Sequence, residues 1–229
     1  MSCSRRWIVL IIKIMRIEKV TDKIALYSCD CMEYMKDIPD NYYDLAICDP
    51  PYGINASEMT MGSGKNKKWI KGKKWDKKTP DNNYFKELFR ISKNQIIWGG
   101  NYFHLPISKC WIVWDKGIYG DCSFSDAELA WTSINQVLRI ARIRYKGFLG
   151  ADSIKIHPTQ KPIKLYEWLL KNYAQPTDKI IDTHFGSCSI GIACHNFGCT
   201  LDACAIDEEY FDMAYKRLRM HVRQLDLFK

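Results

Sequence analysis

Short apolar runs alternate with segments of helical spacing along most of this chain, and this alternation most constrains its fold. Strand-like runs occupy 24–28, 44–48, 95–98, 179–182 and 201–206. Helical segments are predicted at 30–35, 82–92, 163–173 and 189–198, with a last helix through 211–218. Strands that alternate with helices are typical of α/β proteins with a mostly parallel sheet.

The middle of the chain has a different character, because three β-type runs follow one another at 110–114, 127–132 and 138–145. In the last run the two-residue period places Leu138, Ile140, Arg142 and Arg144 on one side and Arg139, Ala141 and Ile143 on the other. A chain of 229 residues is within the range of one domain with an insertion. We therefore expect a single domain over 15–229, with residues 1–14 as a non-native or disordered extension and Met15 as the natural start.

Composition excludes several classes of protein. The longest apolar run, Trp7 to Ile12, has six residues, far fewer than the ~20 that span a bilayer. Apolar residues make up 47% of the chain, as expected of a chain with a packed core rather than a disordered one. The ten cysteines come without a convincing secretory leader, so we expect a cytoplasmic protein (host cytoplasm if phage-encoded) whose cysteines are small core residues.

A metal site is not expected from the sequence. Cysteine and histidine gather between 188 and 204, but without the CxxC or HxxxH spacing of zinc sites. Cys29 and Cys31 are likewise read as core cysteines rather than a redox pair.

Positive charge is concentrated in one segment. The chain has 34 basic and 26 acidic residues, a net charge of +8. Residues 65–78 contain eight lysines and one acid, Asp76, so this window carries +7 and the rest of the chain about +1. A basic loop at 60–80 is predicted to bind a polyanion through its phosphates, because lysines displace condensed counterions. The alternative is a solvated lysine run, against which Trp69 and Trp75 argue.

The four residues Asp49-Pro50-Pro51-Tyr52 are the most informative in the sequence. Asp49 follows a buried strand, at the position where open α/β sheets bind ligands. The prolines fix the backbone and leave the Pro50 carbonyl available to a ligand. A carboxylate, a carbonyl and an aromatic ring together suit a planar ligand with an exocyclic amino group. A rigid strand-ending turn is the structural alternative.

A second strand ends at Asp182 and is followed by a glycine-containing turn and a helix that starts near Ser189. This arrangement brings a small ligand close to backbone amides at a helix N-terminus. The spacing differs from both the GxGxxG fingerprint and the phosphate-binding loop, so this signal alone is weak.

These motifs, with His157-Pro-Thr-Gln-Lys-Pro162 between them, resemble the β class of amino-group DNA methyltransferases. From Tyr27 to Leu218 the chain is similar to phage-type DNA adenine-N6 methyltransferases, enzymes of the kind found in restriction-modification. The order of the motifs carries the resemblance: the catalytic motif first, then a target-recognition region within 53–150, then the 157–162 element and the S-adenosylmethionine loop. It implies a Rossmann-like fold with a mixed, mostly parallel seven-stranded sheet that contains one antiparallel strand.

The resemblance also implies roles for individual residues. The catalytic motif, Asp49, Pro50, Pro51 and Tyr52, is assigned to the target base. Residues assigned to the S-adenosylmethionine cofactor or its surroundings are Asp30, Thr159, Lys161, Asp182, Phe185, Gly186 and Ser187. Expected DNA contacts are Lys67, Lys68, Lys73, Lys74, Arg142 and Arg144, with double-stranded DNA as the partner and a homodimer left open. The segment 98–103 is either a plain turn or one that presents Asn101 or Tyr102 to the substrate, and His157 either binds or fixes a loop.

Two positions depart from the family pattern. Cys188 stands where a second glycine is usual and would crowd the methionine moiety. Ala205 stands where an acid usually holds the ribose hydroxyls, and Asp207, two residues on and expected on the same strand face, is the candidate substitute.

The expected reaction is methyl transfer from S-adenosylmethionine to adenine N6 in duplex DNA. Asp49 and the Pro50 carbonyl would accept the two hydrogens of the amine and direct its lone pair at the methyl group, and positioning would account for most of the acceleration. Cytosine-N4 methylation is the alternative reaction, whose motif more often starts with serine. A non-catalytic DNA-binding relic is the alternative from a different class.

Replacement of Lys67, Lys68, Lys73 and Lys74 by glutamine should weaken binding to DNA of any sequence without changing the methylated site. Each lysine on a phosphate contributes about 0.9 to the slope of log affinity against log salt, so the slope should flatten by up to ~3.6. A salt titration of wild type and variant measures this, with methylation sites mapped in parallel. An unchanged slope would identify a solvated run. A changed target sequence would instead place the lysines on the base-reading surface, where Arg139, Arg142 and Arg144 are expected.

Overall fold

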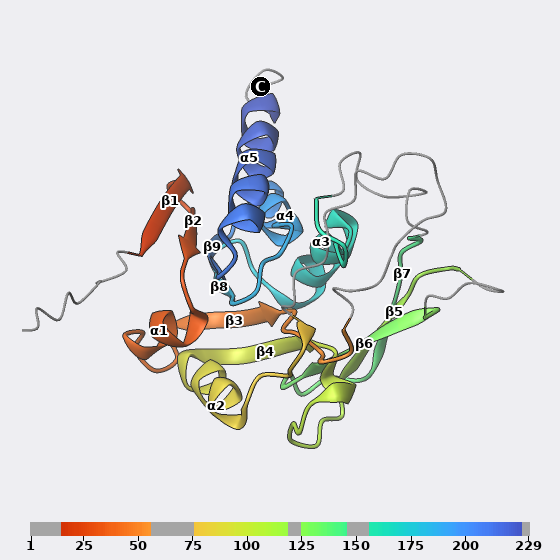
Figure 1. Ribbon diagram of the computed structural model, residues 1–229. Helices are drawn as coiled ribbons and strands as arrows, with labels where there is room; N and C mark the ends of the chain where they lie inside the picture. The colour runs from red at the N-terminus through yellow and green to blue at the C-terminus, as the bar shows by residue number, and fades with distance from the viewer. Residues whose placement is uncertain (1–14, 56–75, 119–124, 146–155, 226–229) are drawn as a thin grey trace, which may run out of the picture.

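The computed structural model describes residues 15–55, 76–118, 125–145 and 156–225 (Figure 1). Its strands are β1 (Arg16–Thr21), β2 (Ile24–Ser28), β3 (Tyr43–Cys48), β4 (Ser92–Trp98), β5 (Trp111–Asp115), β6 (Ala127–Thr132), β7 (Arg139–Arg142), β8 (Lys179–Asp182) and β9 (Thr200–Ala205). Its helices are α1 (Cys31–Lys36), α2 (Asn82–Ile91), α3 (Ile163–Tyr173), α4 (Ser189–Phe197) and α5 (Glu208–Leu225), with a 3₁₀ turn, η3, at Gly100–Tyr102.

The described strands form one sheet in the order β1-β2-β9-β8-β3-β4-β6-β5-β7. The five adjacent strands β2, β9, β8, β3 and β4 run parallel to one another, so their carboxyl ends lie along one edge of the sheet. β1 is antiparallel to β2, and β6 is antiparallel to both β4 and β5. The predicted mixed, mostly parallel α/β sheet is confirmed. The expected seven strands with one antiparallel become nine among the described residues, because β1 and the inserted strands extend both edges.

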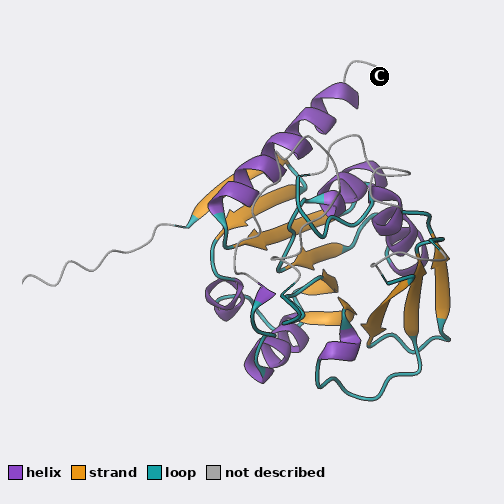
Figure 2. Cartoon of the chain, turned by 45° about the vertical axis from the view of Figure 1, so that its right-hand side comes forward, coloured by secondary structure: helices purple, strands orange, loops and turns teal. Residues whose placement is uncertain are grey.

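Helices cover both faces of the sheet (Figures 1 and 2). Successive side chains of its central strands pack alternately against the two layers of helices. Leu45 and Ile47 of β3 face the core that α3, α4 and α5 complete. Ala46 and Cys48 face the core formed with α1 and α2. Because β3 is buried on both faces, its sequence is a continuous apolar run, as expected of a central parallel strand.

Helix boundaries follow the capping residues in the sequence. Asp30 caps α1 by accepting from the Met32 N–H at 2.8 Å, and Asp81 caps α2 through the N–H groups of Asn83 and Tyr84. Gly198, with φ +88°, ends α4 in the left-handed conformation that is common at helix C-termini.

Two elements differ from the expectation. β1 was not predicted, because its sequence is rich in charged residues and shows little apolar periodicity, as in a solvated edge strand. The predicted 138–145 strand is shorter, since β7 ends at Arg142, although Ile143 and Tyr145 still donate to the backbone of Asp115 and Lys116. In β7 only Ala141 is buried.

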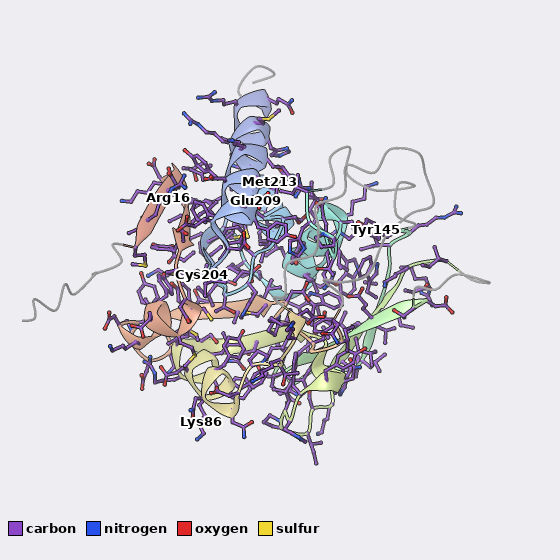
Figure 3. All side chains as sticks on the ribbon, in the orientation of Figure 1. Arg16, Lys86, Tyr145, Cys204, Glu209 and Met213 are labelled. Atoms are coloured by element: carbon purple, nitrogen blue, oxygen red, sulfur yellow. The ribbon has the colours of Figure 1, made fainter. Side chains whose placement is uncertain are left out.

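Eight of the ten cysteines fall in the described residues, all as free thiols and six of them buried. Figure 3 shows Cys204 of β9 in the interior. The prediction that cysteines serve as core residues is confirmed for these six. Among the described helices, none combines the length and the apolar character needed to cross a membrane.

Candidate active site

The motifs predicted from the sequence meet at the carboxyl edge of the sheet. β3 and β8 are neighbours in the sheet, so the chain that leaves β3 at Asp49 lies beside the turn that begins at Asp182. Asp30 follows β2 at the same edge. Parallel strands therefore bring residues more than 130 positions apart into one region.

Tyr52 is held rigidly beside Asp49. Its hydroxyl donates to Asp49 Oδ1 at 2.5 Å. Burial and the Asp49 carboxylate raise the pKa of Tyr52 well above its usual value, so the phenol stays protonated. A Cβ on Gly99 would come within 2.2 Å of the Tyr52 ring, so only glycine permits this packing, and the φ of +69° also favours glycine.

A second aromatic ring covers Tyr52. Tyr102, in η3, stacks on it with ring centroids 5.1 Å apart and an interplanar angle of 13°. Tyr102 is 46% exposed. The structure thus brings Tyr102 to the catalytic motif. It leaves Asn101 exposed in the same turn.

Lys161 lies at the catalytic motif. Its ammonium is 2.6 Å from Asp49 Oδ2, 3.2 Å from Glu128 Oε2 and 3.2 Å from the Tyr52 hydroxyl. Burial opposes its charge, but the carboxylates of Asp49 and Glu128 raise the pKa of Lys161 above its usual value. Lys161 was assigned to the cofactor or its surroundings from the sequence, and the structure places its charged end on the carboxylate of Asp49.

Glu128, on β6, and Lys116, after β5, complete this cluster and were missed by sequence analysis. Lys116 Nζ lies 2.8 Å from Glu128 Oε1. Burial favours the neutral acid, but Lys161 and Lys116 hold the pKa of Glu128 below its usual value. Both residues lie in the β-rich insertion, outside any motif. A charged residue inside a half-apolar strand, Ala127–Thr132, was the available signal.

Asp182 is almost fully buried at the end of β8, where its Oδ1 accepts from the His184 N–H at 2.9 Å. Burial raises the pKa of Asp182 to about 8, in spite of that hydrogen bond. Burial also lowers the pKa of His184 to about 4, so its imidazole is neutral at pH 7. Sequence analysis did not single out His184, whose ring packs against Tyr84.

The turn after Asp182 is shaped by left-handed residues. Gly186 has φ +50° and Cys188 has φ +56°, which explains why glycine is usual at position 188. The Cys188 side chain is buried in the core, where its Sγ would lie 2.5 Å from a Cβ on Gly191. It therefore packs toward α4. Phe185 also points inward, with its ring 5.8 Å from that of Phe211.

A buried arginine braces the same turn. Arg217 of α5 donates to the Ser187 carbonyl at 2.8 Å and to the Ser189 hydroxyl at 3.0 Å. Ser187 is itself buried. The position of the turn therefore depends on α5 as well as on β8.

The 157–162 segment joins the two halves of the site. The His157 ring lies 4.5 Å from the Tyr210 ring and would be in contact with a Cβ on Gly186. Thr159 Oγ1 is 3.1 Å from His157 Nδ1. Lys161, two residues on, reaches Asp49, so this segment spans the distance from the turn to the catalytic motif.

Asp207 is not on β9 as expected, because the strand ends at Ala205. Asp207 lies in the turn before α5, and its Oδ1 accepts from the N–H groups of Glu209 and Tyr210 at 3.0 and 3.1 Å. The expectation of a shared strand face with position 205 is wrong, since the residue serves as a helix cap.

Of the residues expected to contact DNA, the structure describes the two arginines and not the four lysines. Lys67, Lys68, Lys73 and Lys74 lie outside the described residues. The described ends of that segment meet near Tyr52, because Asp76 accepts from the Gly53 N–H at 2.9 Å through its side chain and from the Asn55 N–H at 3.1 Å through its carbonyl. Arg142 and Arg144 are exposed at and beyond β7.

The Asp182 carboxyl should make stability depend on pH. An unfolded aspartate has a pKa of about 3.9, whereas the folded value is about 8, so folding takes up a proton between these values and stability falls as pH rises through this window. Asp182→Asn removes this loss. The free energy of unfolding of the variant, relative to that of wild type, should therefore rise by at least about 1 kcal/mol from pH 4 to pH 8, because one pKa unit corresponds to ~1.4 kcal/mol.

Urea unfolding of the cofactor-free protein across this range measures that difference. Asp44→Asn is the matched control, because Lys179 and Lys93 lower the pKa of Asp44 and its contribution is instead lost as pH falls. A constant difference between wild type and Asp182→Asn would show that Asp182 is ionised in the folded protein.

Comparison with known proteins agrees with this geometry. A model of the N6/N4 DNA methylase family matches residues 101–216, about half of the chain. The type II methyltransferase M.HinfI of Haemophilus influenzae is 25% identical over 88% of this chain and 70% of its own length. In fold, the chain is similar to M1.HpyAVI in complex with SAM, with a TM-score of 0.58 and 21% identity over 85% of this chain and 99% of that one.

Two further structures share the fold, each with a TM-score of 0.51. The putative DNA modification methylase TTHA0409 of Thermus thermophilus, complexed with S-adenosyl-L-methionine, is 15% identical over 86% of this chain and 93% of that one. The cytosine-N4-specific PvuII DNA methyltransferase is 14% identical over 88% of this chain and 94% of that one. From the family match and the arrangement of its motifs, the chain belongs to the N6/N4 DNA methylase family.

Proposed function

We propose that this protein methylates adenine at N6 in duplex DNA, with Asp49 as the residue that accepts from the reacting amine. Its family makes it a DNA methyltransferase that uses S-adenosylmethionine, so the proposal concerns the base and the residues. The observation that carries it is the Asp49 carboxylate at the end of β3, fixed by Tyr52 and Lys161 beside the turn after β8.

The residues at the β8 edge suit the cofactor. S-adenosylmethionine, when bound, supplies an electrophilic methyl group on a sulfonium. The buried carboxyl of Asp182 offers an acceptor whose ionised form a cationic ligand would favour. We assign the cofactor's surroundings to residues that line or brace this edge: Asp30, Thr159, Asp182, Phe185, Gly186, Ser187 and Asp207. Phe185 would act through the backbone shape of the turn, because its ring is in the core.

The chain's contribution to the reaction is largely positional. The lone pair of an exocyclic amine is delocalised into the ring, so the nitrogen is a weak nucleophile. Asp49 and the Pro50 carbonyl would accept its two hydrogens and favour a pyramidal nitrogen whose lone pair is directed outward. The base must leave the duplex to reach this pocket, at a cost of a few kcal/mol. Stacking on the Tyr52 ring would offset part of this cost, with the base in the place that the exposed Tyr102 ring takes in this structure.

An aspartate at the first position of the catalytic motif favours adenine over cytosine. Cytosine-N4 enzymes more often have serine there. The similarity to the cytosine-N4-specific PvuII enzyme keeps that base as the alternative, since the two chains share the fold. The complete set of polar and charged partners around Asp49 argues against a non-catalytic relic.

The base is identified by the modified nucleoside. Amplified DNA, which carries no methylation, is incubated with the protein and S-adenosylmethionine, digested to nucleosides and analysed by mass spectrometry. N6-methyldeoxyadenosine is the expected product. N4-methyldeoxycytidine would establish the alternative base, and the absence of both would remove the proposed reaction.

Asp49→Ala should reduce methyl transfer by roughly 10²-fold or more, as is usual when a catalytic contact is lost. Cofactor affinity should change little, because Arg217 braces the turn after β8 independently of Asp49. The fold should survive, because Lys161 keeps Glu128 as a partner. Methyl incorporation into amplified DNA and calorimetry with S-adenosylmethionine measure the two effects. A variant that keeps more than about a tenth of the wild-type rate would exclude Asp49 from the mechanism.

A further inference from the structure

Glu128, on the inserted strand β6, is linked to the Asp49 carboxylate through the side chain of Lys161. β6 pairs with β4 up to Trp98 and Ala130, and the Gly99 N–H donates to the Leu129 carbonyl at 2.8 Å. Glu128 is the next residue of β6 and therefore lies beside the turn that packs on Tyr52. In this position Glu128, a residue of the insertion, is separated from Asp49 only by the ammonium of Lys161.

The four charged groups of this cluster form a chain of alternating sign. It runs from Lys116 to Glu128, Lys161 and Asp49, with N···O distances of 2.8, 3.2 and 2.6 Å. The charges of two lysines and two acids sum to zero. Exposed fractions of the four side chains are at most 25%, so the interactions are shielded from water.

Lys161 has little freedom to move within this chain. Its ammonium has three acceptors within 3.2 Å, equal to its number of hydrogens. It also lies over the Trp98 ring, 5.2 Å from the centroid. Without Glu128, one of these three acceptors is lost, and Lys161 can shift.

We propose that Glu128 is a positioning residue for the methyl transfer, which acts by holding Lys161 against Asp49 Oδ2. This rests on the proposed function, because it deepens the role of Asp49. Lys161 and Tyr52 each bind one oxygen of the Asp49 carboxylate, so together they fix its rotation. A displacement of about 1 Å in a reacting group can cost ~10²-fold in rate.

The competing explanation is that Glu128 only balances the charge of two shielded lysines. Loss of one partner of a buried ion pair leaves an uncompensated charge and destabilises the protein. The two explanations differ in the effect of restored charge balance. If Glu128 positions Lys161, the rate of methyl transfer stays low when the charge is balanced by other means. If Glu128 only balances charge, the rate recovers.

The test starts with Glu128→Met, which keeps a side chain of similar length and removes both its charge and the oxygens that accept from Lys161. The expected result is a fall of at least tenfold in the single-turnover rate of methyl transfer to amplified DNA. The affinity for S-adenosylmethionine by calorimetry should stay within threefold of wild type. In steady state kcat should fall and the KM for DNA should stay within threefold. Glu87→Met is the matched control, because Glu87 pairs with Arg90 on the surface of α2, away from the site.

The double variant Glu128→Met with Lys116→Met restores a net charge of zero without restoring an oxygen acceptor for Lys161, and it decides the question even if the single variant does not fold. The proposal expects it to remain at least tenfold slower than wild type with cofactor affinity intact. Recovery to within threefold of the wild-type rate would overturn the proposal in favour of charge balance. A parallel loss of cofactor affinity, or a single variant as fast as wild type, would also overturn it.

The wild-type protein separates this inference from the proposed function. If wild type transfers no methyl group to DNA, the proposed function fails. If wild type is active and both variants are equally active, the proposed function stands and the positioning role of Glu128 fails alone.

Discussion

The ion pair between Lys161 and Asp49 is the interaction on which the arrangement of the site depends. It joins the segment after residue 157 to the end of β3, and the same segment rests on the turn after β8 through His157. The end of β3 and the turn after β8 are therefore held in a common frame. A shift of either part would move apart the Lys161 ammonium and the Asp49 carboxylate, which lie 2.6 Å from each other. In a region with little water this separation of opposite charges costs electrostatic energy.

The parallel strands made this arrangement predictable in outline. Once 44–48 and 179–182 are assigned as buried strands of a parallel sheet, Asp49 and Asp182 must both lie at its carboxyl edge. Caps at Asp30 and Gly198 could also be predicted, because capping depends on local chemistry that the sequence displays. These elements required no knowledge of distant contacts.

The features that escaped prediction depend on distant contacts. Glu128 and Lys116 belong to the site because β6 pairs with β4, and no local pattern encodes that pairing. Asp207 was expected on a strand because its distance from position 205 was counted by the two-residue period, but the strand had ended and the local capping geometry prevailed. β1 was missed because an exposed edge strand carries little apolar signal.

The left-handed Cys188 has a consequence for how this turn can vary among related chains. Its sulfur fills the space in which a side chain at position 191 would begin, so the two positions share one volume. A cysteine at 188 disfavours any side chain at 191, and with glycine at 188 the remaining close neighbour of such a Cβ would be Leu218, whose Cδ2 lies 3.0 Å away. The two positions should therefore change together over evolutionary time, and an exchange at 191 would require both a smaller residue at 188 and a small shift of Leu218.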